Sequence, residues 1–305
     1  MLVVLLGASA LTFALGPLAP GDPAQLVLER TLERPPTTPE IDQKREELGL
    51  DRPVAAQYLA WLGQTVHGDL GESWVTGVSV STSIRERLPR TLLLTSTALL
   101  LSIVIALPLG VLAAHKRNSL ADNVFRGSAI VAASTPGYLL AYALILFLAV
   151  RLEVLPAFGF GSPGDLVLPA LSLAIGSAAG LARFTRSSVL EVLEDDYMRT
   201  ARAKGAGTAA VLVRHGLRNA SVPITTVIGL SLGGLFGGAF VVEWIFAWPG
   251  IGTLAVDAIG DKDYPVIQGF VLVTAAASVV ANFLTDLAYA SLDPRVRLVG
   301  GGRAR

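Results

Sequence analysis

Long apolar segments recur along this chain and constrain its fold more than any other feature. A helix that crosses the hydrocarbon core of a bilayer needs about 20 mostly apolar residues. Only 16% of the residues are charged, against roughly a quarter in soluble domains. The candidate spans are Met1–Gly16, Thr91–Ala114, Gly127–Val150, Val167–Phe184, Val222–Ala247 and Pro265–Tyr289. The sequence therefore predicts an all-α integral membrane protein with six transmembrane helices.

The first segment also has an interpretation as a signal peptide. A signal peptide normally begins with basic residues and ends at a small-residue cleavage site, and Met1–Gly16 shows neither clearly. We therefore expect this segment to be the first transmembrane helix. The predicted parts of the chain are this helix (1–16), a large extracytoplasmic loop (17–90), a membrane core (91–290) with a cytoplasmic loop at 185–221, and a C-terminal tail (291–305).

The distribution of Lys and Arg predicts the orientation. With the N-terminus inside, the loops at 115–126, 183–221 and 290–305 are cytoplasmic and hold 14 of these residues. The two short outer loops hold only Arg151 and Lys262. Basic residues in short loops stay on the cytoplasmic side. We therefore expect both termini to be cytoplasmic in a multi-pass protein of the plasma or inner membrane.

The large outer loop has its own pattern. The stretch LAPGDPA (18–24) predicts a turn because of its prolines and glycine, and ERPPTTPE (33–40) is expected to be extended. Helices are predicted at 41–48 and 54–66. Tyr58, Leu59, Trp61 and Leu62 form one amphipathic face of the second helix. That face suits the membrane surface, the spans or ordinary loop packing. The charges of RERLPR (85–90) are interpreted as interfacial residues that snorkel.

Small residues recur four apart in two of the spans. Such spacing lets helix backbones approach closely in lipid, and a helix with so little side-chain bulk also suits a translocation path. Two acidic residues near span ends, Glu243 and Asp286, are functional hypotheses by their position, with an interfacial place or structural pairing as the alternatives. The candidate packing or path residues are Gly229, Gly233, Gly234, Gly237, Gly238 and Glu243, and Gly176 and Gly180 share the spacing.

Several kinds of chemistry are missing from the sequence. It contains no Gly-Lys pair and therefore no phosphate-binding P-loop. There are no cysteines, and the three histidines share no metal-ligand spacing, so we predict no catalytic, cofactor or metal site. Formal net charge is zero, which does not favour nucleic acid as a partner. Any uphill transport must then draw on a partner protein or on an ion gradient.

The most basic stretch lies between the fourth and fifth spans. It reads DDYMRTARAKGAG from Asp195, in which an Asp suits a helix N-cap and Gly205 suits a helix end. A second helix is predicted from Thr208 to Asn219. The orientation rule alone explains the basic residues, but it does not explain a capped, small-residue helix followed by glycine. We interpret the segment as a slim helix suited to a groove in another protein.

The same segment and several others resemble a known family. The stretches are PGDPA (20–24), LGLDRPVAAQYLAWL (48–62), GDLGES (68–73), RLPRT (87–91), DYMRTARAKG (196–205), RHGLRNA (214–220), FAWPGIG (246–252), DYP (263–265) and DPR (293–295). Together they are similar to ABC-transporter permease subunits, and more narrowly to the first subunit class of the dipeptide/oligopeptide/nickel branch. The general signature begins Glu-Ala-Ala, whereas Arg199, Thr200 and Ala201 stand here, and its later Ile-x-Leu-Pro is replaced by residues 215–218.

The resemblance implies a mechanism and partners. A second, homologous permease would complete the path, two ABC ATPase subunits would bind ATP and magnesium, and an extracytoplasmic binding protein would deliver a di- or oligopeptide, glutathione or nickel. The residues implied in ATPase docking are Asp196, Tyr197, Arg199, Thr200, Ala201, Arg202, Ala203, Lys204, Gly205, His215 and Arg218. The alternatives are an ion-driven transporter or channel, which would need paired intramembrane charges or repeats, and a membrane-embedded enzyme.

Overall fold

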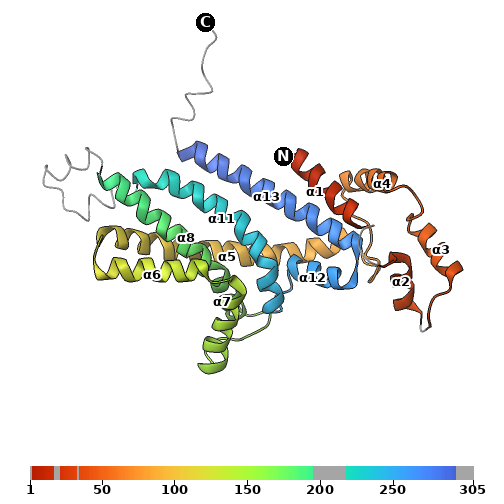
Figure 1. The fold of residues 1–305 in the computed structure, drawn as a ribbon, viewed down its shortest axis with the longest axis horizontal. Coiled ribbons are helices and arrows are strands. Elements are labelled where there is room, and N and C mark those ends of the chain that lie inside the picture. Colours follow the sequence, from red (N-terminus) through yellow and green to blue (C-terminus); the bar gives the residue numbers. More distant parts are fainter. Residues whose placement is uncertain (1, 17–20, 33, 195–217, 293–305) are drawn as a thin grey trace, which may run out of the picture. The chain divides into compact units, whose positions relative to one another are not determined.

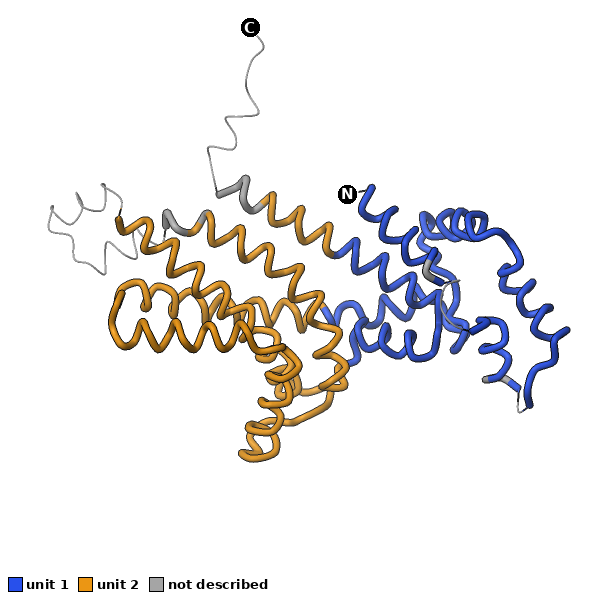
Figure 2. Tube along the Cα trace, viewed as in Figure 1, with its two compact units in different colours: residues 1–91, 249–277 blue, residues 92–248, 278–305 orange. Residues whose placement is uncertain are grey.

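The computed structural model describes residues 2–16, 21–32, 34–194 and 218–292. These residues are helical almost throughout, and their only β-pairing is an isolated bridge between Glu72 and Ser79. The chain divides into two compact units. Unit 1 comprises residues 1–91 and 249–277, and unit 2 comprises residues 92–248 and 278–305 (Figure 2).

Four helices of the described residues are long and apolar enough to cross a membrane. They are α5 (Val80–His115), α8 (Val167–Glu194), α11 (Arg218–Ile245) and α13 (Tyr264–Leu292), shown in Figure 1. The first predicted span corresponds to α1 (Leu2–Leu15), which is apolar but shorter. The all-helical membrane architecture is therefore confirmed, with four candidate spans, or five if one bent pair of helices is counted as one, and the count of six stays a prediction.

The predicted third span is not one helix with a kink. It forms α6 (Leu120–Ser134), α7 (Gly137–Leu144) and a π-helical continuation, η2 (Ile145–Arg151), and the path bends by 105° between α6 and α7. Thr135 and Pro136 are both extended at the bend. Proline disfavours helical geometry at the residue before it, so Pro136 breaks the segment. The prediction of a single helix over Gly127–Val150 is therefore wrong.

Two spans extend ten residues or more beyond their predicted limits. The helix α8 continues to Glu194, ten residues past Phe184, so the first part of the predicted loop 185–221 is helical. The helix α5 begins at Val80 and therefore includes the RERLPR charges in its first turns. Hydropathy marks only the apolar part of a helix, and both helices continue where their residues become polar.

Three short helices of unit 1 lie in the predicted outer loop. They are α2 (Pro23–Thr31), α3 (Thr38–Glu47) and α4 (Val54–Val66). The last two confirm the helices predicted at 41–48 and 54–66, although α3 begins earlier. Of the turn predicted at 18–24, residues 18–20 lie outside the described residues and Gly21 is in a bend with a φ of 107°. Pro23 is not part of the turn, because it opens α2, where the Asp22 carboxylate accepts a hydrogen bond from Ala24 N at 3.0 Å. Proline is well suited to a first helical position, where no N–H partner is needed.

The helix α4 packs on α1 through aromatic side chains. The ring of Phe13 lies 5.5 Å from that of Tyr58 and 6.1 Å from that of Trp61, centroid to centroid. The Ser9 and Tyr58 hydroxyls are 3.0 Å apart. Leu59, on the predicted amphipathic face, is instead 66% exposed. Of the three alternatives for this helix, packing on a span applies to Tyr58 and Trp61.

The N-terminus of α3 provides a pH-dependent contact outside the spans. Hydrogen bonds from Arg34, then from Thr37, lower the pKa of Glu40 from 4.5 to about 2. A carboxylate with a lowered pKa stabilises the fold fully above its unfolded-state pKa. This contribution is therefore complete above about pH 4.5 and is lost as the pH falls towards 2.

The Glu40 pKa gives a direct prediction. In Arg34→Gln, the titration midpoint of the Glu40 carboxyl carbon, followed by ¹³C NMR of the labelled protein, should rise towards 4.5, because the largest cause of the lowering is removed. Lys44→Gln, which removes a partner of Glu47 on the same helix, should leave the Glu40 midpoint unchanged. An unchanged midpoint in Arg34→Gln would contradict the assignment.

Candidate functional site

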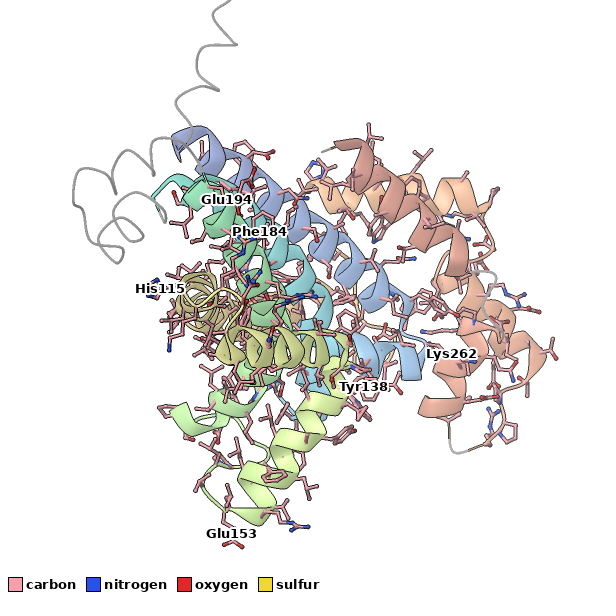
Figure 3. The ribbon with its side chains drawn as sticks, turned by 60° about the vertical axis from the view of Figure 1, so that its left-hand side comes forward. His115, Tyr138, Glu153, Phe184, Glu194 and Lys262 are labelled. Atoms are coloured by element: carbon pink, nitrogen blue, oxygen red, sulfur yellow. The ribbon has the colours of Figure 1, made fainter. Side chains whose placement is uncertain are left out.

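Most of the predicted ATPase-docking residues lie outside the described residues. This applies to every one of them from Asp196 to His215, while Arg218 is the first residue of α11. The segment runs from Glu194, the last residue of α8, labelled in Figure 3, to the start of α11. The described part of the site is therefore the set of helices in unit 2 that carry this segment.

A buried ion pair joins α6 to α8 close to this end of the bundle. Arg186 Nε and Nη2 donate to the two carboxylate oxygens of Asp122, at 2.7 Å each. The Asp122 side chain is fully buried and that of Arg186 is 18% exposed. Two parallel bonds between a guanidinium and a carboxylate fix both distance and orientation. The pair therefore fixes how the start of α6 lies against α8.

The same carboxylate shapes the corner between α5 and α6. Asp122 Oδ2 accepts a hydrogen bond from Asn118 N at 3.0 Å, and Asn118 has a left-handed φ of 64°. Ser119 caps α6 by accepting from Asp122 N at 3.3 Å. Asparagine tolerates the left-handed region better than most residues. A second ion pair, Arg117 Nη1 to Glu194 Oε1 at 2.6 Å, joins the same corner to α8 in solvent.

The helices α5 and α8 approach each other closely beside the buried pair. A Cβ added at Gly110 would lie 2.7 Å from the carbonyl oxygen of Ala182 and 2.7 Å from Thr185 Cβ. Around this contact lies a core of buried apolar residues from α5, α8 and α11, namely Ala106, Ala114, Ala178, Leu181, Ala182, Val189 and Ile224. Glycine at 110 therefore permits the α5–α8 contact, and the pair Asp122–Arg186 adds α6 to it.

A groove of unit 2 brings together some of the predicted small residues. Its volume is about 530 Å³, and it is lined by residues of α7, α8 and α11 together with Thr135. Gly176 and Gly180 of α8 face Gly234 and Gly238 of α11 across it. Ser172, Ser177 and Ser231 add hydroxyl groups, and Tyr138, labelled in Figure 3, lies at its α7 side.

The α11 glycines separate into two kinds. Gly229 is buried, and a Cβ there would lie 2.1 Å from Thr285 Cγ2, so it serves helix packing against α13. Gly238 would meet only Leu173 Cδ2, at 3.2 Å. Gly233, Gly234 and Gly237 have open space at the Cβ position. Only Gly229 among these five therefore requires glycine for a close approach, and of the others Gly234 and Gly238 line the groove.

The two acidic residues near span ends differ in burial. Glu243 is fully buried in α11, beside a core that includes Val242, Ile245 and Phe246. Its side chain is therefore enclosed by protein on all sides. Asp286 of α13 is exposed. Neither residue lines the groove.

Several of the recognised sequence stretches meet in unit 1. Asp263, of the DYP stretch, accepts hydrogen bonds from Ser73 Oγ and, at 3.1 Å, from Trp74 N. Thr91 Oγ1, of RLPRT, accepts from Ile251 N at 2.9 Å. Arg90 Nη1 donates to the Pro249 carbonyl at 3.2 Å, so Arg90 joins α5 to the loop that contains Pro249 instead of only snorkelling.

Unit 1 also has a cleft of about 760 Å³. Its lining combines the aromatic rings of Phe13, Trp61, Trp74 and Tyr264 with the side chains of Arg45, Glu72 and three glutamines. Sequence reasoning named Trp61 for an amphipathic face and included Asp263 and Tyr264 in a recognised stretch, but it predicted neither this cleft nor the pairing of Asp122 with Arg186. The sequence did contain one signal for the pairing of Asp122 with Arg186. Asp122 precedes one apolar segment and Arg186 follows the next, so opposite charges flank two segments that are neighbours in a helical bundle.

Comparisons with known proteins cover nearly the whole chain. The family described as binding-protein-dependent transport system inner membrane component matches residues 106–298, and its N-terminal companion matches residues 1–95. The oligopeptide transport system permease protein AppB of Bacillus subtilis is 40% identical in an alignment 304 residues long. The alignment covers 96% of this chain and 95% of that protein. The glutathione transport system permease protein GsiC of Escherichia coli O6:H1 is 39% identical, over 95% and 93% of the two chains.

A solved structure shares the fold. A chain of the MetNI methionine ABC transporter in inward-facing conformations superimposes with a TM-score of 0.59 at 21% identity, over 69% of this chain and 96% of that one. A helical membrane fold of this kind, matched to transport components along its length, defines a permease subunit. The chain belongs to the family of binding-protein-dependent transport system inner membrane components, in the branch of the peptide and oligopeptide ABC permeases.

Proposed function

We propose that this chain forms half of the path of an ATP-driven importer for di- or oligopeptides, and that it takes its energy from two separate ATPase subunits. Family membership along residues 1–95 and 106–298 carries the proposal. The sequence has no P-loop of its own, which fits a subunit that binds no nucleotide. A second homologous permease would complete the path, and an extracytoplasmic binding protein would deliver the solute.

The proposed topology has six crossings with both termini in the cytoplasm. The excess of basic residues in the loops at 115–126, 183–221 and 290–305 supports this orientation. The bent pair α6–α7 with η2 would then count as one crossing and α1 as another. In this arrangement unit 1 contains the extracytoplasmic segment 17–90, and the segment 195–217 faces the ATPases.

Coupling would occur through residues 196–205. The capped, small helix that the sequence predicts to end at Gly205 would suit a groove of an ATPase, with Arg199, Arg202 and Lys204 as contact residues. A transport cycle of this kind needs contacts that differ in strength between two states. Closure of the ATPases on ATP would move the docked helix and thereby the spans. The names of AppB and GsiC support a peptide or glutathione as the solute.

Co-purification from cells tests this function. The chain should be co-expressed with its genomic neighbours, isolated in detergent and assayed for ATP hydrolysis with the binding protein and a defined mixture of short peptides. Isolation of a second permease and ATPases in one complex is the expected result. If the chain instead purified alone and exchanged solute in liposomes without ATP, the ion-driven alternative would hold.

Substitution of Gly205 tests the docking segment. Gly205→Leu and Gly205→Pro should lower the number of peptides imported per ATP hydrolysed by about tenfold, within the usual range of coupling energies, while the chain stays inserted. The matched control is Gly127→Leu, at an exposed position of α6 where a Cβ would meet nothing within 4 Å. Normal transport by the Gly205 variants would refute the proposed role of this segment.

A further inference from the structure

The last turns of α8 are held by contacts with two other helices, α5 and α6. The helix ends at Glu194, immediately before the segment 195–217. Eight residues earlier, Arg186 makes two 2.7 Å bonds to a fully buried carboxylate on α6. The close α5–α8 contact at Gly110 lies beside Arg186, because it involves Ala182 and Thr185. Three helices of unit 2 therefore converge at one level of α8.

Stability alone does not account for a buried ion pair. Removing two charges from water is costly, and well-packed apolar residues often stabilise a fold as well or better. A bidentate pair does differ from apolar packing in its geometry, because it allows one distance and one orientation of the two groups. Buried ion pairs are best attested where a unique arrangement matters. The Asp122–Arg186 pair has this character, since it fixes α6 and the α5–α6 corner in one register on α8.

The corner itself depends on the same carboxylate. Asp122 accepts the Asn118 backbone N–H, so loss of the carboxylate would release the left-handed turn as well as Arg186. A displacement applied at the end of α8 would then pass to α6 and α5 only through apolar contacts, which permit sliding, and through the solvent-exposed Arg117–Glu194 pair, which holds the helices weakly. With the ion pair intact, the same displacement would move the three helices together.

We propose that Asp122 and Arg186 are positioning residues for energy coupling, which hold α5, α6 and α8 as one body so that motion delivered at the end of α8 reaches the spans. This inference rests on the proposed function, in which the segment after α8 docks on an ATPase. The pair touches neither nucleotide nor solute. Its effect is on the efficiency with which ATP hydrolysis becomes transport.

Near-isosteric changes in the complete transporter test the proposal. Arg186→Lys keeps the charge but loses the two-pronged geometry, and Asp122→Asn keeps the shape but loses the charge. In liposomes with the partner permease, the ATPases, the binding protein and a di- to pentapeptide mixture, both should import about fivefold fewer peptides per ATP hydrolysed, the lower end of typical coupling energies. Association with the ATPases should be normal.

The solvent-exposed pair Arg117–Glu194, which joins the α5–α6 corner to α8, is the matched control. Arg117→Lys and Glu194→Gln alter a solvent-exposed ion pair whose side chains are 51% and 66% exposed, and such pairs contribute little. These variants should import as many peptides per ATP as the native complex. The proposal would be overturned if the variants of the exposed pair lost as many peptides imported per ATP as the variants of the buried pair. It would also be overturned if neither Arg186→Lys nor Asp122→Asn lowered that number.

A cross-link separates positioning from general damage to the fold. Because the chain contains no cysteine, Arg117→Cys and Glu194→Cys can be introduced in the Arg186→Lys background and joined with a cleavable bifunctional thiol reagent. Restoration of peptides imported per ATP on cross-linking, and its loss on cleavage, is expected. No restoration in fully cross-linked protein would contradict the proposal. Failure of ATPase co-purification with the native chain would instead refute the proposed function itself.

Discussion

Gly229→Ala is expected to destabilise the protein strongly. The added Cβ would lie 2.1 Å from Thr285 Cγ2 and 2.6 Å from Thr285 Cβ. Rotation of the Thr285 side chain can move Cγ2 away but leaves Cβ in place, so α11 and α13 must separate. Overpacking of a tight contact costs about 1–3 kcal/mol and occasionally more, and we expect the upper end here because the clash includes Thr285 Cβ. The thermal unfolding temperature in detergent, followed by the fluorescence of the tryptophans, should fall accordingly.

A neighbouring glycine provides the control for this prediction. Gly233→Ala, one helical turn away in α11, adds a Cβ that meets nothing within 4 Å, so the unfolding temperature should not fall. The double variant Gly229→Ala/Thr285→Gly should recover part of the lost stability, because the clashing side chain is removed. Equal unfolding temperatures for Gly229→Ala and Gly233→Ala would show that α11 and α13 do not pack through Gly229.

Asp263→Ala is expected to have the second largest effect, in unit 1. Its carboxylate is 4% exposed and accepts from Ser73 Oγ and Trp74 N. Ser73 Oγ in turn accepts from the backbone of Val75, at 3.2 Å, and of Thr76, at 2.9 Å. Removal of the carboxylate leaves buried donors without a partner, and hydrogen bonds to charged groups contribute about 1.5–3 kcal/mol each. We expect a loss of about 3 kcal/mol.

The measurement combines unfolding with proteolysis. Asp263→Ala should lower the unfolding temperature and expose the turn at 73–77 to cleavage, whereas Asp263→Asn, which keeps one acceptor oxygen, should show an intermediate loss. Asp257→Ala, an exposed aspartate on α12 (Ile251–Asp261), is the control and should behave as the native chain. If the turn in Asp263→Ala resisted proteolysis as well as it does in the native chain, the carboxylate would have no anchoring role.

The sequence predicts the elements of this fold better than their directions. Apolar length located α5, α8, α11 and α13, because a helix in lipid must be apolar along its length. The same measure overlooked the 105° bend at Thr135 and Pro136, since hydropathy records composition and carries no information on direction. Whether a proline such as Pro136 kinks or breaks a helix depends on what packs around it, so its position in the sequence does not give the angle.

Pairing over long sequence distance is the other limit. Asp122 and Arg186 are 64 residues apart, and Asp263 lies 190 residues from Ser73, so no local periodicity connects them. The glycine pattern was informative about close packing in general, yet it did not distinguish Gly229, which meets Thr285, from Gly233, Gly234 and Gly237, which meet nothing. That distinction depends on the rotation of α11 relative to its neighbours.

The contact of α4 with α1 has a consequence for how the protein is made. Tyr58 follows Ser9 by 49 residues, so all of α1 is synthesised before the first residue of α4 is added. Until then Ser9 and Phe13 lack the ring and hydroxyl that later cover them. The α1–α4 contact can therefore form only after Tyr58 has been added to the chain, and it joins a helix at the start of the chain to one made later.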